Sequence, residues 1–222
     1  MSTLTLDCTL AYMSKTSAKA SSSKRTAILD AARRSFLRIG FSNTNLDEVA
    51  ATADVSKMTI YSHFGSKEML FLAVIEDVIA ERSSGAPTLD AEVAEADLET
   101  VLVHVAEDLI RTVRHPDVVG LRRVLIAEQP RHPELAATWR SATVVATVRE
   151  LAAFFEGLER RGLLVGVEPR ALARQFLWML IGDPLDAALL GSARTMVRAR
   201  TSAQQAVRLV LAAHRGTRDR QP

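Results

Sequence analysis

Apolar residues recur every three or four positions along most of the chain, the spacing that buries one face of an α-helix. The clearest pattern lies between residues 43 and 68, where two short amphipathic helices joined by a turn lead into a third. Their buried faces are formed by Leu46, Val49, Ala50, Ala53, Val55, Ile60 and Phe64. A short helix with a polar front, held by a second helix, fits the major groove of DNA. Periodicity alone leaves open an ordinary helical hairpin within a helical core.

Capping residues predict where these helices begin. Thr44 or Asn45 can cap the first short helix, because a side-chain oxygen there satisfies a free backbone N–H. Asp54 stands where the chain must reverse, and aspartate tolerates a left-handed backbone better than most residues. Ser56 can cap the second short helix and Ser66 the next helix along the chain.

The remaining pattern predicts an all-α protein of about nine helices. Besides a first helix over residues 25–41 and the two short helices, we expect helices over residues 66–82, 98–113, 118–128, 134–161, 171–190 and 202–214. Serine, glycine and proline interrupt the pattern at residues 83–87. The run Leu163-Leu164-Val165 is too brief to predict a strand. Pro184 lies inside a predicted helix, where it would free a carbonyl group either to face a ligand or simply to curve the helix.

Charge is unevenly distributed along the 222 residues. The formal net charge is only +2, but nine basic residues stand against four acidic ones between Lys15 and Lys67. A local basic surface supplies the salt-dependent attraction to DNA phosphates. Residues 1–23 read as a flexible arm, which either reaches the DNA or is a tail without a role.

Other features of the sequence indicate the cellular compartment and argue against an enzyme. Cys8 is the only cysteine, so an intrachain disulfide is impossible, which suits a reducing cytosol. No apolar run approaches the roughly 20 residues of a membrane span, so we expect a cytoplasmic protein without a membrane partner. His104 and Asp108 could share a helix face, but no third metal ligand has recognisable spacing, and a core histidine is the commoner outcome. We therefore predict no catalytic residue, metal or cofactor.

The N-terminal part resembles the DNA-binding domain of the TetR family of bacterial transcriptional regulators. The resemblance begins with the helix over residues 25–41 and extends to about residue 70. It is carried further by Thr44, Val49-Ala50, Ala53, Val55-Ser56, Thr59-Ile60-Tyr61, His63-Phe64 and Ser66-Lys67-Glu68-Met69-Leu70. Two positions depart from the family pattern, since Asp54 and Met58 stand where glycine is usual. Met58 places a bulky apolar side chain near the DNA groove, so the base preference of other family members cannot be transferred to this chain.

The region from Leu121 to Gly191 resembles the C-terminal domain of AefR-like members of this family. The matching pieces are Glu128, Pro133-Glu134-Leu135, Trp139, Arg161-Gly162-Leu163-Leu164, Ala173 and Phe176. The resemblance implies a helix-turn-helix domain over residues 24–70, a helical ligand-binding and dimerisation domain over residues 71–215, and a tail over residues 216–222. It further implies a homodimer that acts as a repressor, released from double-stranded operator DNA by a small molecule.

Candidate site residues come from the resemblance and from the helix faces. The expected DNA-contacting residues are Thr44, Ser56, Lys57, Met58, Thr59, Tyr61, His63 and Lys67. The candidates for a ligand cavity are Phe71, Ile75, Leu109, Trp139, Phe155, Phe176, Trp178 and Met179, with core packing the commoner role for any one of them. Solvation of Lys67 and partial burial of Tyr61 remain alternatives to DNA contact.

The last two predicted helices carry more apolar surface than a monomer needs, which predicts a four-helix seam between two subunits. The residues expected there are Phe176, Leu177, Leu180, Ile181, Leu185, Leu189, Leu190, Val207, Val210 and Leu211. Two other functions stay open. One is a small-molecule carrier or enzyme that has lost operator binding, and the other is an activator or a ligand-independent architectural DNA binder.

Overall fold

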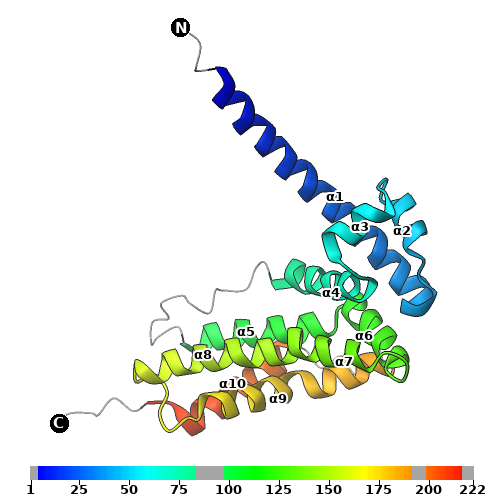
Figure 1. Cartoon of the computed structure of the whole chain (residues 1–222). Helices are drawn as coiled ribbons and strands as arrows, with labels where there is room; N and C mark the ends of the chain where they lie inside the picture. The colour runs from blue at the N-terminus through cyan, green and yellow to red at the C-terminus, as the bar shows by residue number, and fades with distance from the viewer. Residues whose placement is uncertain (1–4, 84–97, 192–198, 217–222) are drawn as a thin grey trace, which may run out of the picture. The chain divides into compact units, whose positions relative to one another are not determined.

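The structure is a computed structural model that describes residues 5–83, 98–191 and 199–216 (Figure 1). The chain forms two compact units, Met1–Asp77 and Val78–Pro222. The boundary falls inside a helix, later in the chain than the predicted boundary after residue 70. The described residues are helical apart from short turns and one isolated bridge, so the predicted all-α class is confirmed.

The first unit contains three helices and most of a fourth. These are α1 Thr5–Asn43, α2 Leu46–Thr52, α3 Lys57–Phe64 and α4 Lys67–Ser83, which continues into the second unit. Helix α1 begins at Thr5, although the sequence predicted a flexible arm up to residue 23. Neither glycine nor proline precedes Gly40, and alanine and lysine favour helix, so the local sequence does not stop the helix. At Gly40 the backbone leaves the helical region, with φ 82° and ψ 175°.

Three aromatic rings close the core of the first unit. Phe36 lies edge-on to Phe71 with ring centroids 5.0 Å apart, and Phe41 lies 5.4 Å from Phe71. All three rings are at most 2% exposed. Such edge-to-face pairs add to the stabilisation from burial. Of the residues that the sequence proposed for a ligand cavity, Phe71 therefore packs against α1, and Ile75 is 3% exposed.

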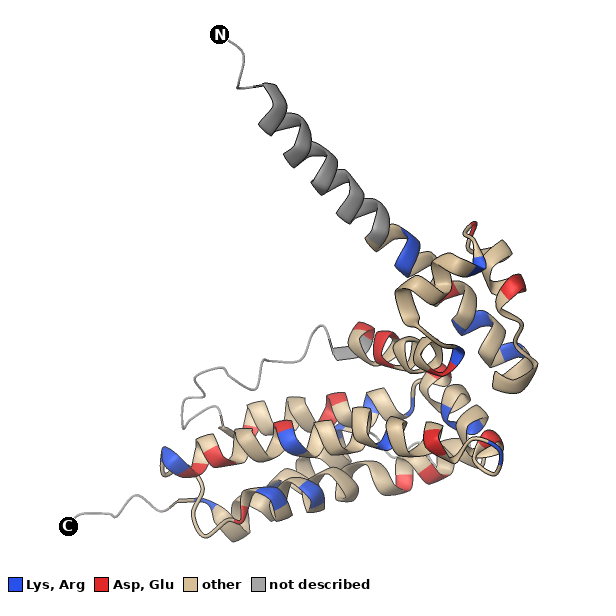
Figure 2. Ribbon diagram, in the orientation of Figure 1, with Lys and Arg blue, Asp and Glu red and all other residues tan. Residues whose placement is uncertain are grey.

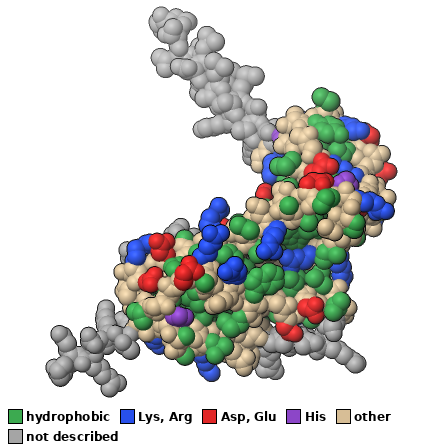
Figure 3. Space-filling model, turned by 60° about the horizontal axis from the view of Figure 1, so that its bottom comes forward, with side chains coloured by type: hydrophobic (Ala, Val, Ile, Leu, Met, Phe, Trp, Pro, Cys, Tyr) green, Lys and Arg blue, Asp and Glu red, His purple; other side chains and the backbone are tan. Residues whose placement is uncertain are grey.

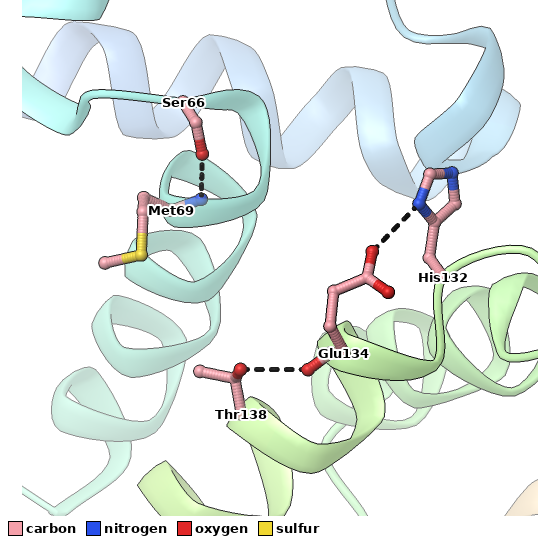
Figure 4. A network of polar contacts seen from close by, with 5 residues as sticks. All are labelled: Ser66, Met69, His132, Glu134 and Thr138. Carbon is pink, nitrogen blue, oxygen red and sulfur yellow. Dashed lines mark hydrogen bonds and ion pairs between the residues drawn. The ribbon is translucent and has the colours of Figure 1, made fainter.

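The helix starts in this unit agree with the predicted caps. Of the two candidates for α2, Asn45 is the cap, since its Oδ1 accepts from the Asp47 N–H at 2.9 Å. Ser56 accepts from the Thr59 N–H at 3.1 Å and caps α3. The Ser66 hydroxyl accepts from the Met69 N–H at the start of α4 (Figure 4).

The second unit is a bundle of helices beyond α4. Its helices are α5 Leu98–Val113, α6 Pro116–Glu128, α7 Pro133–Arg140, α8 Ala146–Arg160, α9 Pro169–Leu189 and α10 Ala199–His214. Figure 4 shows the start of α7, where Glu134 lies beside His132 and its carbonyl accepts from Thr138. The bundle core includes the rings of Phe155 and Phe176, edge-on with centroids 5.6 Å apart.

The predicted helix over residues 134–161 is interrupted. A π-helical turn, Ser141–Val145, separates α7 from α8. Counted as one interrupted helix, these pieces bring the described residues to the nine helices expected. Helix α9 continues through Pro184. Its C-terminal end is held by Arg123 of α6, whose guanidinium donates to the carbonyls of Ala188 and Leu189 at 2.8–3.2 Å.

The brief apolar run before α9 forms the isolated bridge. The Val165 N–H donates to the His214 carbonyl at 2.7 Å, and the Gly216 N–H donates to the Leu163 carbonyl at 3.2 Å. This bridge attaches the end of α10 to the turn between α8 and α9. Among the described residues, no helix combines the length and apolar content needed to cross a membrane.

Candidate nucleic-acid interface and effector cavity

The turn between α2 and α3 sets the position of the α3 front. Asp54 adopts φ 52°, the left-handed conformation that the sequence predicted for it. The Val55 N–H donates to the Ala50 carbonyl at 3.0 Å, which closes the turn. Behind α3, Ile60 and Phe64 are 1% and 9% exposed, so the helix is held by its buried back. The polar front is thus presented by a helix whose entry and packing are both defined.

Several predicted DNA-contacting residues lie on this exposed front. Met58 is 75% and Tyr61 40% exposed, and Ser56 and Lys57 are also exposed. Thr59 and His63 are partly exposed. The ribbon in Figure 2 marks basic positions on α1 and α3 and acidic positions on α2.

Lys57 has an acidic partner in this face. Its Nζ lies 2.9 Å from Oδ2 of Asp47 on α2, and both side chains are well exposed. The hydrogen bond and the charge of Asp47 raise the pKa of Lys57 above its usual value. Lys57 is therefore fully charged at neutral pH, and a phosphate would compete with Asp47 for it.

Two predicted DNA contacts have other roles in the structure. Thr44 is 3% exposed, and its hydroxyl donates to the Gly40 carbonyl at 2.7 Å and lies 3.1 Å from the Ser35 hydroxyl. Lys67 donates to the Ser42 carbonyl at 3.2 Å, with its Nζ 4.8 Å from the centre of the Phe41 ring. Both side chains are thus bound to residues of α1. The sequence pattern could not separate such a contact from a DNA contact, because both need a polar side chain at a helix start.

A cavity of about 770 Å³ lies within the second unit. It is lined from α5 to α9, and Ile79 of α4 also contributes. The apolar wall includes Val105, Leu109, Val113, Val118, Trp139, Val144, Leu151, Phe154, Leu177 and Ile181. Its polar and charged lining residues are Asp108, Thr112, Arg122, Thr143, Thr147, Glu150 and Arg160.

Two of the eight predicted ligand residues, Leu109 and Trp139, line this cavity. Phe155 and Phe176 are fully buried in the bundle core. Trp178 and Met179 are 40% and 44% exposed on α9, away from the cavity lining. The sequence did not predict the polar residues of the lining, because a charged residue within a helix is expected to face solvent unless its packing neighbours are known.

The predicted subunit seam is also corrected. Eight of its ten residues are buried within the subunit, including Leu180 at 1% and Val210 at 4% exposure, because α9 and α10 pack against α5 and α8. Leu190 is 77% exposed and Leu189 partly exposed. The large apolar residues exposed on the two helices themselves are Trp178, Met179 and Leu209. Figure 3 shows broad areas of exposed apolar side chains on the second unit.

The candidate metal pair is not assembled. His104 is exposed on α5, contrary to the expectation of a core histidine, and Asp108 pairs with Arg111 at 2.6 Å. Within the described parts of the chain, no cluster of three or more metal-ligating side chains occurs.

Comparison with known proteins matches both halves of the chain to family models. Residues 28–74 match the bacterial regulatory proteins of the tetR family, and residues 100–215, more than half of the chain, match the AefR-like transcriptional repressor C-terminal domain.

Individual relatives agree with these matches. The transcriptional activator FasR of Mycolicibacterium smegmatis is 29% identical over 73% of this chain and 75% of its own length. The transcriptional repressor NicS of Pseudomonas putida is 28% identical over 67% of this chain and 70% of its own. The solved structure of the flavonoid-responsive regulator FrrA is 30% identical, covers 86% of this chain and 97% of its own, and has a TM-score of 0.71. The chain belongs to the TetR family of helix-turn-helix transcriptional regulators.

Proposed function

We propose that this protein is a homodimeric, cytoplasmic repressor that a small molecule releases from its operator. The observation that carries this proposal is the α3 front, exposed and polar, on a helix with a capped start and a buried back. DNA binding is favoured by such a preorganised helix, because part of the binding free energy is otherwise lost in ordering the side chains that contact the bases.

The α3 front offers groups for both parts of DNA recognition. Lys57 supplies a charge for phosphate, while Ser56 and Tyr61 supply hydroxyl groups for phosphate or base edges. Met58 is suited to apolar contact, such as the methyl group of thymine. Asp47 gives Lys57 a partner in free protein, so operator binding replaces one ion contact with another.

Operator binding also requires a second copy. Two recognition helices reach one face of DNA when a two-fold axis spaces them about one helical turn apart. The exposed apolar residues Trp178, Met179 and Leu209 supply a surface on α9 and α10 for this contact. A partner covering them would remove this apolar surface from water.

The cavity in the second unit is the proposed effector site. Its volume of about 770 Å³ lies within the range of small-molecule sites. The name of FrrA describes a regulator that responds to flavonoids, which supports a responsive site on this fold. The effector would favour a conformation whose recognition helices no longer match the two half-sites.

The proposal is tested by binding to the promoter of the protein's own gene. Tyr61→Ala and Lys57→Ala should each weaken binding, and Lys57→Ala should flatten the salt slope by about one unit if its phosphate contact is lost. Fluorescence anisotropy over a salt series measures both effects. Arg149→Ala on α8 is the control for loss of an exposed positive charge outside the α3 front.

Wild-type affinity in both α3 variants would contradict the assigned DNA face. A wild-type protein without salt-dependent, specific promoter binding would instead favour a small-molecule carrier or enzyme that has lost operator binding. Promoter activity with and without the protein then decides between repressor and activator. The relatives differ in this respect, since NicS is named a repressor and FasR an activator.

A further inference from the structure

We propose that the cavity of the second unit selects an amphipathic organic acid, whose carboxylate is bound by the guanidinium of Arg122, which lies over the Trp139 ring. The apolar part of the ligand would lie against α5, α8 and α9. This inference rests on the proposed effector site, and it adds the chemical class of the effector.

Arg122 is a partly buried cation without an acidic partner among the described residues. Its guanidinium carbon lies 5.0 Å from the centre of the Trp139 ring, and no ion pair with a described carboxylate accompanies this contact. Burial lowers the pKa of Arg122, yet a guanidinium keeps its charge at neutral pH. A desolvated cation of this kind gains most from an anion that binds both of its N–H edges.

Trp139 provides the buried ring over which the Arg122 guanidinium lies. The residue is 4% exposed, and its Nε1–H has no hydrogen-bond acceptor among the described residues. Nε1 has almost no accessible surface, so the ligand would contact the guanidinium that lies over this ring rather than the indole N–H itself.

The other basic lining residue already has an acidic partner. Arg160 pairs with Glu156 at 3.2 Å. Of the two acidic lining residues, Asp108 pairs with Arg111 at 2.6 Å, and Glu150 is exposed on α8. Arg122 is thus the lining cation left for a ligand, which favours an acid over a neutral or basic molecule.

The remaining lining residues indicate that the part of the ligand beyond its carboxylate is apolar. Leu109, Leu151, Phe154, Leu177 and Ile181 make the wall apolar. The π-helical turn Ser141–Val145 places three of its residues on this wall, and such turns occur frequently at functional sites. The Thr143 hydroxyl donates to the Trp139 carbonyl at 2.9 Å and ties the turn to the tryptophan.

The test compares acids with their neutral amides. 4-Phenylbutanoate, octanoate and 2-naphthoate, each beside its primary amide, are titrated into the full-length protein without DNA by isothermal calorimetry. We expect at least one carboxylate to bind, and its amide to bind about tenfold to hundredfold more weakly, because hydrogen bonds to a charged partner are lost.

Arg122→Gln should weaken binding of the carboxylate by a similar factor and leave the affinity for the amide little changed. Arg122→Lys keeps the charge without the paired donors, so it should retain part of the selectivity. Arg149→Gln is the matched control, because Arg149 is exposed and lies outside the cavity lining. Circular dichroism establishes that each variant is folded.

A second readout uses Trp139 itself. The chain has two tryptophans, so Trp178→Phe leaves Trp139 as the single reporter of the cavity. The bound carboxylate should change its fluorescence on excitation at 295 nm, and Arg122→Gln in the same background should shift the titration midpoint by the same factor.

Three results would overturn the inference: no binding by any of the acids, equal binding of acids and amides, or wild-type affinity in Arg122→Gln. These measurements contain no DNA, so their failure leaves promoter binding untouched. Conversely, selective binding of an acid by a protein that fails to bind its promoter would overturn the proposed repressor function alone.

Discussion

At the residue scale, Asp54 occupies a turn position that requires a left-handed backbone, and aspartate tolerates that conformation better than most residues. Its φ of 52° lies in the left-handed region, which costs most L-residues roughly 1–2 kcal/mol. Most members of the family have glycine here, as the resemblance implies, and glycine enters this region without that cost. The backbone hydrogen bond across the turn holds α3 in place, so the conformation matters more than the side chain.

We therefore expect Asp54→Gly to retain nearly all the stability of the full-length protein, and Asp54→Val to be less stable than Asp54→Gly by about 1–2 kcal/mol, because a β-branched residue resists positive φ. Chemical denaturation followed by circular dichroism measures the difference. Equal midpoints for the two variants would show that the turn can relax without strain.

The lysines of the first unit illustrate the limit of reading single residues. Lys57 and Lys67 both begin helices with a polar face, and both were assigned to DNA. In the structure Lys57 is exposed, whereas Lys67 binds the Ser42 carbonyl and lies over Phe41. A Lys67 variant would therefore disturb the unit as well as any DNA contact, which is why the promoter test uses Lys57.

At the element scale, α9 and α10 are apolar on more than one side. One face packs against the other helices of the bundle, and a second carries the exposed residues Trp178, Met179 and Leu209. The sequence placed the excess of apolar surface on ten other residues of this region, eight of which are buried within the subunit. It could not say which face remains uncovered, because both faces repeat at helical spacing.

Adjacent positions on α10 separate the two faces. Val210→Glu would bury an unpaired carboxylate, at a cost of several kcal/mol, and should unfold the second unit. Leu209→Glu should preserve the fold and dissociate the dimer, because Leu209 is 62% exposed in the subunit. Sedimentation velocity and circular dichroism, run on both variants, distinguish these effects.

A Leu209→Glu protein that remains as dimeric as wild type would place the seam elsewhere. A wild-type protein that is monomeric at micromolar concentration would contradict the dimer proposal as a whole.

At the scale of the whole molecule, the proposed repressor has two sites that must influence one another. The α3 front belongs to the first unit and the cavity to the second. Helix α4 belongs partly to both, since the boundary after Asp77 divides it. Its C-terminal part contributes Ile79 to the cavity lining, so a ligand bound there as proposed would contact the helix that spans the unit boundary.

Linkage makes this coupling measurable in both directions. A carboxylate that binds the cavity should weaken promoter binding by about 5-fold to 150-fold, and promoter DNA should weaken carboxylate binding by the same factor. Anisotropy with saturating ligand measures the first factor, and calorimetry with saturating DNA the second. Unequal factors would mean that the ligand or the DNA also binds at a second site, and a factor of one in both directions would leave the cavity without a regulatory role.

The sequence by itself determined the local features of this protein. Helical periodicity, the caps at Asn45, Ser56 and Ser66, and the reversal at Asp54 depend on neighbours within a few residues, so a linear pattern contains them. The family was also recognisable, because its motif lies within one continuous segment. The π-helical turn was missed, since one extra residue in a turn leaves the hydrophobic pattern almost unchanged.

The tertiary structure alone decided which side chains face each other across helices. Thr44 became a buried hydrogen-bonding residue, Phe71 a core residue, and Trp178 a surface residue, although each fits a helical pattern equally well in another role. Arg122 and Trp139 lie on different helices, and their contact arises only when α6 packs beside α7. Non-local packing determines burial and pairing, and burial and pairing determine what a charged or aromatic side chain can bind.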